Sequence, residues 1–156
     1  MQLSQKLSWL DMCAGPGGKA AYIYYSLRDK KPEDEFMANE ISEHRAALIA
    51  QVIPGNVVNV GSGLDLKKEG RLFDRILVDA PCSGLGALRR RPEARWRKSL
   101  HDLKELVLLQ RNLLDAAADN LDEEGVIAYA TCSPHLAETR VQVADFLYRH
   151  KNFELQ

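Results

Sequence analysis

Short apolar runs alternate along the chain with longer segments of helical periodicity. The runs that predict strands lie at about 7–12, 35–39, 56–60, 73–79 and 125–131, with room for a sixth at 152–155. Helical patterns fall between them, at about 18–28, 43–51, 103–121 and 136–149. This alternation is typical of a parallel sheet covered by crossover helices on both faces. We therefore predict an α/β fold with a mostly parallel sheet.

The helix predicted over 103–121 has the clearest periodicity. Its apolar stripe recurs at intervals of three and four residues and consists of Leu106, Leu109, Leu113, Leu114 and Ala117. The core-facing positions of the helix at 136–149 are expected among Val141, Ala144, Phe146, Leu147 and Tyr148. The acidic stretch DNLDEEG before the last predicted strand is expected to be a solvated helix end and turn. Segment 84–102 breaks the alternation, and ordered loops of that length are usually functional.

Composition narrows the class of protein. The chain has 156 residues, of which 46% are hydrophobic and 28% charged, as in a single globular domain. Its formal net charge of −1 means that a nucleic-acid partner must be met by a local basic patch. Three widely spaced cysteines favour neither a disulfide framework nor a metal site, and they indicate a cytoplasmic setting. The apolar runs are too short for a membrane helix, and no signal peptide is recognised.

The segment after the first predicted strand, DMCAGPGGKA, has the character of a ligand-binding loop. Gly15, Gly17 and Gly18 allow a sharp turn and a close backbone approach, and the helix that follows offers free N–H groups. Glu40 ends the second strand, where an acid can accept hydrogen bonds from ribose hydroxyls. A simple tight turn would explain the glycines alone. With the strand, helix and acid in place we favour an adenosine-containing cofactor, either a nicotinamide dinucleotide or S-adenosylmethionine.

Two cysteines follow two predicted strands, in DAPCSG and TCSP. If the fourth and fifth strands are neighbours, Cys82 and Cys132 emerge at the same edge of the sheet, where open parallel sheets bind ligands. A free cysteine is most often a small buried hydrophobe, and that alternative suits Cys13 better. A redox dithiol is a further alternative, but both thiols would then be expected on one turn.

The loop after DAPCSG contains the sequence LRRRPEARWRK. Its cationic and aromatic side chains could contact phosphates and stack on unpaired bases, namely Arg89, Arg90, Arg91, Arg95, Trp96, Arg97 and Lys98. The alternative is that the charge run is only a solvated loop. The four histidines do not cluster in the sequence, and none is assigned a role.

The segments DMCAGPGGKA, DAPCSG and YATCSP together resemble, in order and spacing, the first, fourth and sixth motifs of the RNA cytosine-5 methyltransferases of the Fmu/Sun and Nop type. The resemblance extends over nearly the whole chain and is strongest to bacterial members that act on small-subunit ribosomal RNA. It implies a class I S-adenosylmethionine-dependent methyltransferase fold of the Rossmann-like kind, S-adenosylmethionine as cofactor and RNA as partner. It also favours an RNA-binding role for the basic loop.

The resemblance implies a role for each site residue. Cys132 is the nucleophile that adds to carbon 6 of cytosine, and Cys82 assists later, when the carbon 5 proton leaves and the adduct is eliminated. Asp79 could hydrogen-bond or protonate the base, although a strand-end acid that caps a turn is the alternative. Lys19 could place positive charge near the cofactor or near Cys132, or it could be a solvated lysine.

The cofactor contacts implied by the resemblance lie at the ends of the first four predicted strands. The loop round the methionine moiety comprises Cys13, Ala14, Gly15, Pro16, Gly17, Gly18 and Lys19. Glu40 is the ribose acid, and Asp79 is a further contact. The family usually has a Gly-Asp pair after the third strand, whereas this chain has VGSGLDL, so either Ser62 or Asp65 makes the adenine-side contact.

Members of the family usually carry a preceding RNA-binding region and a closing strand hairpin. We therefore expect residues 1–156 to form a catalytic core that lacks this hairpin. Two other functions stay open: a nicotinamide-dependent oxidoreductase, supported by the glycine loop and Glu40, and a non-catalytic RNA-binding module.

Overall fold

The structure is a computed structural model that describes residues 6–156 except for 33, 91, 93–95 and 97–98. The chain divides into two compact units. The first unit comprises residues 1–79 and 116–129, and the second comprises 80–115 and 130–156. Of the residues predicted to bind RNA, Arg91, Arg95, Arg97 and Lys98 lie outside the described part of the chain.

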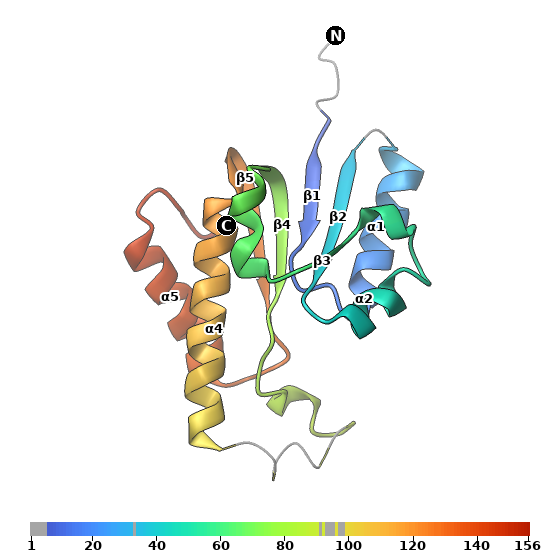
Figure 1. Cartoon of the computed structure of the whole chain (residues 1–156). Coiled ribbons are helices and arrows are strands. Elements are labelled where there is room, and N and C mark those ends of the chain that lie inside the picture. The colour runs from blue at the N-terminus through green and yellow to red at the C-terminus, as the bar shows by residue number, and fades with distance from the viewer. Residues whose placement is uncertain (1–5, 33, 91, 93–95, 97–98) are drawn as a thin grey trace. The chain divides into compact units, whose positions relative to one another are not determined.

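Five strands form one sheet in the order β3-β2-β1-β4-β5 (Figure 1). Their bounds are β1 Ser8–Asp11, β2 Glu35–Glu40, β3 Val58–Val60, β4 Phe73–Asp79 and β5 Leu121–Ala130. β1 pairs in parallel with β2 and β4, and β2 with β3. β4 and β5 also run in parallel, because hydrogen bonds join Phe73 to Asn120 at one end and Ala80 to Ala130 at the other. The predicted parallel α/β sheet is thus confirmed.

The helices are α1 Gly18–Lys30, α2 Glu43–Ile49, α4 Leu100–Asp119 and α5 Arg140–Arg149. In the first unit α1 and α2 contribute Ala20, Leu27 and Ile49 to a core cluster that also includes Phe36 and Ala38 of β2. Phe36 and Ala38 share one face of β2, because side chains alternate along a strand. On α4 the predicted stripe is buried at Leu113, Leu114 and Ala117. No described helix has the length and apolarity that a membrane span needs.

The sixth strand predicted at 152–155 is wrong. These residues form a turn followed by irregular chain. Phe153 instead packs edge-on against Phe146 of α5, with ring centroids 5.1 Å apart. An apolar side chain that covers a helix end gives the same local pattern as the first residue of a strand, and only its packing partner distinguishes the two.

The acidic stretch DNLDEEG is only in part a helix end. α4 ends at Asp119, and β5 already begins at Leu121. Asp122, Glu123 and Glu124 are exposed strand residues. β5 lies at the edge of the sheet, where charged side chains are tolerated and discourage pairing with another chain.

The helix predicted over 136–149 is divided in the structure. A separate helical turn, Leu136–Glu138, precedes the helix. The buried residues of α5 are Gln142 and Phe146, whereas Val141 and Tyr148 are exposed. The hydrogen bond from Gln142 Nε2 to the carbonyl of Val107 offsets the cost of burying this polar side chain. Periodicity along the chain cannot predict this partner.

Candidate active site

The glycine loop between β1 and α1 is shaped by its contact with Glu40. The Gly15 N–H donates to Glu40 Oε2 at 3.0 Å. A Cβ at position 15 would lie 2.2 Å from that oxygen, so only glycine fits without displacing the carboxylate. Gly17 has a φ of 110°, which side-chain-bearing residues rarely adopt. Gly15 and Gly17 therefore have a structural reason to be glycine, whereas a Cβ at Gly18 would have no atom within 4 Å.

The carboxylate of Glu40 is buried and anchored from several sides. Only 3% of the residue is exposed. Its Oε1 accepts hydrogen bonds from Arg45 Nη2 at 2.6 Å and from the Ser42 N–H at 2.8 Å. Glu40 thus joins the glycine loop to the start of α2.

Asp11, at the end of β1, is a candidate that the sequence interpretation missed. It is 1% exposed, and its carboxylate oxygens make no well-formed hydrogen bond to a described residue, although the backbone N–H of Cys13 is close enough to act on its pKa. Burial, reinforced by the nearby Asp79 carboxylate, raises the pKa of Asp11 to about 7. The sequence feature that could have indicated Asp11 is an acidic residue at the end of an apolar strand.

Cys13 differs from the other two cysteines. Burial, with a further contribution from the Asp11 and Glu40 carboxylates, raises the pKa of the Cys13 thiol to about 12. A thiol of that pKa is protonated at neutral pH and is a poor nucleophile. Cys13 is therefore suited to packing rather than to covalent chemistry.

A buried asparagine, also missed in the sequence, links the strand ends of the first unit. Asn39 Nδ2 donates to the carbonyls of Met12 at 3.1 Å and Gly61 at 3.2 Å. Its Oδ1 accepts from Asn59 Nδ2 at 2.9 Å. The loops after β1, β2 and β3 are thereby held together.

Lys19 and Asp79 form an ion pair, with Nζ and Oδ2 2.6 Å apart. Lys19 lies in the first turn of α1, and Asp79 is the last residue of β4. The side chains are 59% and 30% exposed, so solvent screens the pair. Lys19 is thus more than a solvated lysine, because it neutralises the acid predicted to face the base.

The two residues predicted for the adenine side lie on one turn after β3. Ser62 caps this turn, and its hydroxyl accepts from the Leu64 N–H at 3.2 Å. Asp65 is exposed, and its backbone N–H donates to the Ser62 carbonyl at 3.0 Å. Ser62 and Asp65 are therefore close together in space.

In the second unit, Cys82 and Cys132 lie together. Their Sγ atoms are 3.0 Å apart, and both residues are thiols rather than halves of a disulfide. The two turns pair residues at a constant offset along the chain. The Ala80 N–H donates to the Ala130 carbonyl, and the hydroxyl oxygens of Ser83 and Ser133 are also 3.0 Å apart. The sequence analysis expected the two thiols of a redox dithiol to lie on one turn. Here the thiols lie on two different turns, and the tertiary structure nevertheless brings them into contact.

A buried polar group lies behind the two cysteine turns. Glu138 is 0% exposed and accepts hydrogen bonds from the Ser83 N–H at 2.8 Å and the Ser83 hydroxyl at 2.5 Å. Gln110 Nε2 donates to Glu138 Oε1 at 3.0 Å. Burial acts to raise the pKa of Glu138, but hydrogen bonds from Ser133, Ser83 and Gln110 outweigh it and hold that pKa below its usual value.

An open pocket of about 770 Å³ adjoins Cys132, which is itself exposed. Its lining includes Gly86, Arg89, Arg90, Thr131 and Pro134. A Cβ at position 86 would lie 2.6 Å from the Cys132 carbonyl oxygen, so glycine is required for the loop to approach the cysteine turn. The pocket combines a thiol with two guanidinium groups, a set suited to a polyanionic ligand that reacts with a nucleophile.

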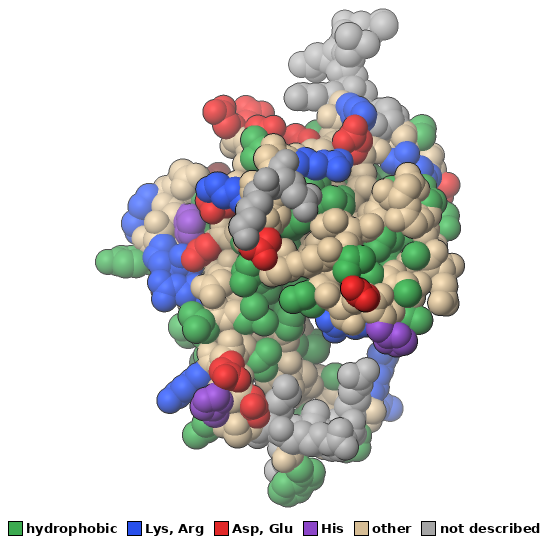
Figure 2. All heavy atoms as spheres, in the orientation of Figure 1, with side chains coloured by type: hydrophobic (Ala, Val, Ile, Leu, Met, Phe, Trp, Pro, Cys, Tyr) green, Lys and Arg blue, Asp and Glu red, His purple; other side chains and the backbone are tan. Residues whose placement is uncertain are grey.

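Charged side chains of both signs lie intermixed on the described surface that Figure 2 draws. Trp96 is 82% exposed. Attraction of an anionic polymer would therefore depend on the local cluster to which Arg89 and Arg90 belong.

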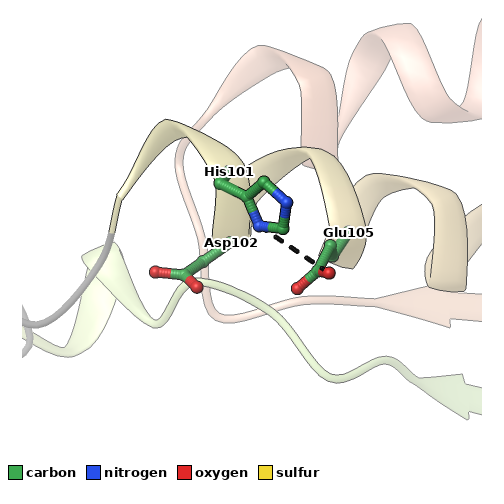
Figure 3. Close-up of side chains that lie close together, drawn as sticks. All are labelled: His101, Asp102 and Glu105. Atoms are coloured by element: carbon green, nitrogen blue, oxygen red, sulfur yellow. Dashed lines mark ion pairs between the residues drawn. The ribbon is translucent and has the colours of Figure 1, made fainter.

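A histidine and two acids gather at the start of α4 (Figure 3). His101 and Glu105 form an i,i+4 ion pair with 3.7 Å between Nδ1 and Oε1. Asp102 caps the helix, because its Oδ2 accepts from the Ser99 N–H at 2.7 Å. The pair and the cap account for the cluster without a metal ion.

Comparison with known proteins gives consistent results. The family model "16S rRNA methyltransferase RsmB/F" matches residues 1–156. Two Mycobacterium tuberculosis proteins named as methyltransferases are 51% identical over 148 residues, which cover 91% of this chain and 31% of each relative. Ribosomal RNA small subunit methyltransferase B of Pectobacterium carotovorum is 37% identical over 156 residues, covering 94% of this chain and 34% of the relative.

Solved structures agree with the sequence relatives. NSun6 from Pyrococcus horikoshii, solved with SFG, matches with a TM-score of 0.78 and 29% identity, covering 92% of this chain and 37% of that one. The chain spans about a third of the length of the curated relatives that it matches. Because the family match extends over its whole length, this chain belongs to the 16S rRNA methyltransferase RsmB/F family.

Proposed function

We propose that residues 1–156 form the catalytic domain of a cytoplasmic enzyme that methylates carbon 5 of a cytosine in RNA, with S-adenosylmethionine as methyl donor. Small-subunit ribosomal RNA is the proposed substrate, in keeping with the family and with relatives named for that activity. The observation that carries the proposal is the pair of thiols 3.0 Å apart, with the exposed Cys132 lining an open pocket.

Residues of the first unit fit an adenosine-containing methyl donor. Glu40 lies at the end of β2, where a carboxylate can accept hydrogen bonds from ribose hydroxyls. The buried Asp11 carboxylate makes no well-formed hydrogen bond to a described residue, and an ammonium group would supply the missing donors. A structural neighbour was solved with SFG, an analogue of S-adenosylmethionine. When bound, S-adenosylmethionine supplies an electrophilic methyl group.

The proposed chemistry of the base uses Cys132, Cys82 and Asp79 in the roles that the family resemblance implies. Carbon 5 of cytosine is a weak nucleophile, and addition of the Cys132 thiolate to carbon 6 makes it reactive. Asp79 would hydrogen-bond the ring as charge develops on it, and its 2.6 Å ion pair with Lys19 would hold the carboxylate in place. After methyl transfer, Cys82 would assist removal of the carbon 5 proton and release of Cys132.

RNA binding is proposed for the basic loop. Arg89 and Arg90 line the pocket beside Cys132 and could contact the phosphates that flank the target base. The exposed Trp96 offers a surface on which an unpaired base could stack. The proposed partner is therefore RNA with an accessible, unpaired cytosine.

One experiment tests the proposed function. The protein is incubated with methyl-labelled S-adenosylmethionine and protein-free small-subunit ribosomal RNA, and any label is mapped to a nucleotide and a ring position. We expect 5-methylcytosine with the wild-type chain and none with Cys132→Ala. Label at another base, or undiminished label with Cys132→Ala, would overturn the assignment. Calorimetry with S-adenosylhomocysteine and with NAD separates methyl transfer from the oxidoreductase alternative.

A further inference from the structure

Glu138 connects the two cysteine turns, although no motif of the sequence singles it out. It ends the helical turn Leu136–Glu138, six residues after Cys132 along the chain. Its carboxylate accepts two hydrogen bonds from Ser83, the residue after Cys82. A segment that follows the second cysteine thus holds the turn that carries the first.

Cys82 is held on both of its sides. On one side, the Ser83 N–H and hydroxyl donate to separate oxygens of Glu138 at 2.8 and 2.5 Å. On the other side, the Pro81 carbonyl accepts from Gln110 Nε2 at 2.9 Å, and the same nitrogen donates to Glu138 Oε1. The backbone of the Cys82 turn is therefore fixed relative to the carboxylate.

Cys132 is held through its neighbour and its own carbonyl. The Ser133 hydroxyl lies 3.0 Å from the Ser83 hydroxyl, which is itself bound to Glu138. The Cys132 carbonyl accepts from the Gly86 N–H at 2.9 Å. Ser83, Gln110, Ser133 and Glu138 are each 5% exposed or less, so water does not compete for these hydrogen bonds.

We propose that Glu138 is a positioning residue that keeps the two thiols in register. It does not touch the reacting atoms. Through Ser83, Ser133 and Gln110 it holds Cys82 and Cys132 so that both sulfurs face one substrate. A displacement of about 1 Å at a reacting group can cost on the order of 100-fold in rate, so a buried hydrogen-bond group behind a thiol pair has a direct catalytic consequence.

The consequence for methyl transfer rests on the proposed function, but the positioning itself can be measured without RNA or cofactor. Diamide, a diazene, oxidises two thiols to a disulfide and takes up the two electrons and two protons that they lose. The rate at which Cys82 and Cys132 become a mapped disulfide reports how well they are held together. Alkylation of Cys132 by iodoacetamide in a Cys82→Ser background gives the intrinsic thiol reactivity for normalisation.

Two substitutions at position 138 separate hydrogen bonding from charge. Glu138→Gln keeps an oxygen that accepts from Ser83 and Gln110 and offers an N–H to the Ser83 hydroxyl, so we expect a disulfide rate within about 3-fold of wild type. Glu138→Ala removes the acceptors, and we expect a normalised rate at least ~10-fold slower. Glu154→Ala, at an exposed glutamate, is the control for a loss of one carboxylate.

If Glu138→Ala does not fold, Ser133→Ala tests the same connection with the loss of one hydroxyl and should slow disulfide formation about 3-fold or more. The proposal would be overturned if the variant that folds, Glu138→Ala or Ser133→Ala, formed the Cys82–Cys132 disulfide at the same rate as the wild-type protein.

Methyl transfer provides the second measurement. Glu138→Ala should lower kcat by about 10- to 100-fold with little change in the KM for RNA, and Glu138→Gln should restore most of it. Should wild type form the disulfide in a Glu138-dependent manner but methylate no RNA, the proposed function fails and the positioning role stands. An equal loss in Glu138→Gln and Glu138→Ala, with both folded, would assign the effect to the charge and overturn positioning by hydrogen bonds.

Discussion

Cys82 Sγ and Cys132 Sγ lie 3.0 Å apart although the residues are fifty positions apart in the chain. The same offset relates Ala80 to Ala130 and Ser83 to Ser133. The segments that follow β4 and β5 therefore run side by side with one constant offset from Ala80 and Ala130 into both turns. Parallel pairing makes the two Cys-Ser dipeptides neighbours, and each thiol contacts its counterpart.

The two cysteines are expected to give opposite results when replaced. Cys132→Ala should abolish methyl transfer, because no thiol is left to add to the base. Cys82→Ala should permit addition and impair release, so a covalent protein–RNA complex should accumulate. Denaturing gel electrophoresis with labelled RNA detects that complex. The assignment of roles is reversed if the complex accumulates with Cys132→Ala instead.

Gly15→Ala should weaken cofactor binding. The new Cβ would lie 2.2 Å from Glu40 Oε2, a carboxylate held by Arg45 and Ser42, so either the loop or the acid must move. We expect S-adenosylhomocysteine to bind at least ~10-fold more weakly in calorimetry, which corresponds to about 1.4 kcal/mol. Gly18→Ala is the matched control, because nothing lies within 4 Å of a Cβ there. Equal affinities in the two variants would contradict the role of Glu40.

Asp11→Asn should stabilise the free protein only at higher pH. The folded-state pKa of Asp11 is raised from 3.8 to about 7, so the native state holds the proton more strongly than the unfolded state does. Burial of the carboxylate therefore costs free energy as pH rises from about 4 to 7, up to about 4 kcal/mol above pH 7. Urea unfolding should show Asp11→Asn gaining stability over wild type at pH 8 and little at pH 4.

The same substitution should weaken binding of S-adenosylhomocysteine if the Asp11 oxygens hold the ammonium group of the cofactor. A variant that is more stable yet binds less well is expected where a buried charge serves a ligand. Calorimetry at pH 8 measures this loss. Unchanged affinity would remove Asp11 from the cofactor site while leaving its effect on stability.

Arg89→Ala and Arg90→Ala should weaken RNA binding and reduce its dependence on salt. Each lost phosphate contact with a single strand lowers the slope of log K against log salt by about 0.7. Fluorescence anisotropy with a single-stranded RNA at several salt concentrations gives that slope. Arg140→Ala serves as control, since this exposed arginine does not line the pocket. Identical slopes for all three variants would separate the pocket from RNA binding.

Local sequence determined the alternation of strands and helices, because side-chain periodicity follows from the geometry of the single element. It also determined the glycine loop, Glu40 and the two cysteine turns, since these residue types have a specific use directly after a strand. Each of these features involves residues close together in the chain. The predictions around Phe153 and the acidic stretch before β5 were wrong. An apolar residue or a run of acidic residues is compatible both with a helix end and with a strand, and the local sequence does not distinguish the two.

Tertiary structure alone decided which side chains share an environment. Burial, with the distant Asp79 carboxylate, raises the pKa of Asp11, and Glu138 accepts its hydrogen bonds from Ser83 and Gln110, which are also distant in the sequence. The contact between Cys82 and Cys132 likewise depends on the pairing of the segments that follow β4 and β5. Burial and hydrogen bonding act through space, so a pattern of neighbours along the chain can indicate which residues are reactive but not which residues hold them in place.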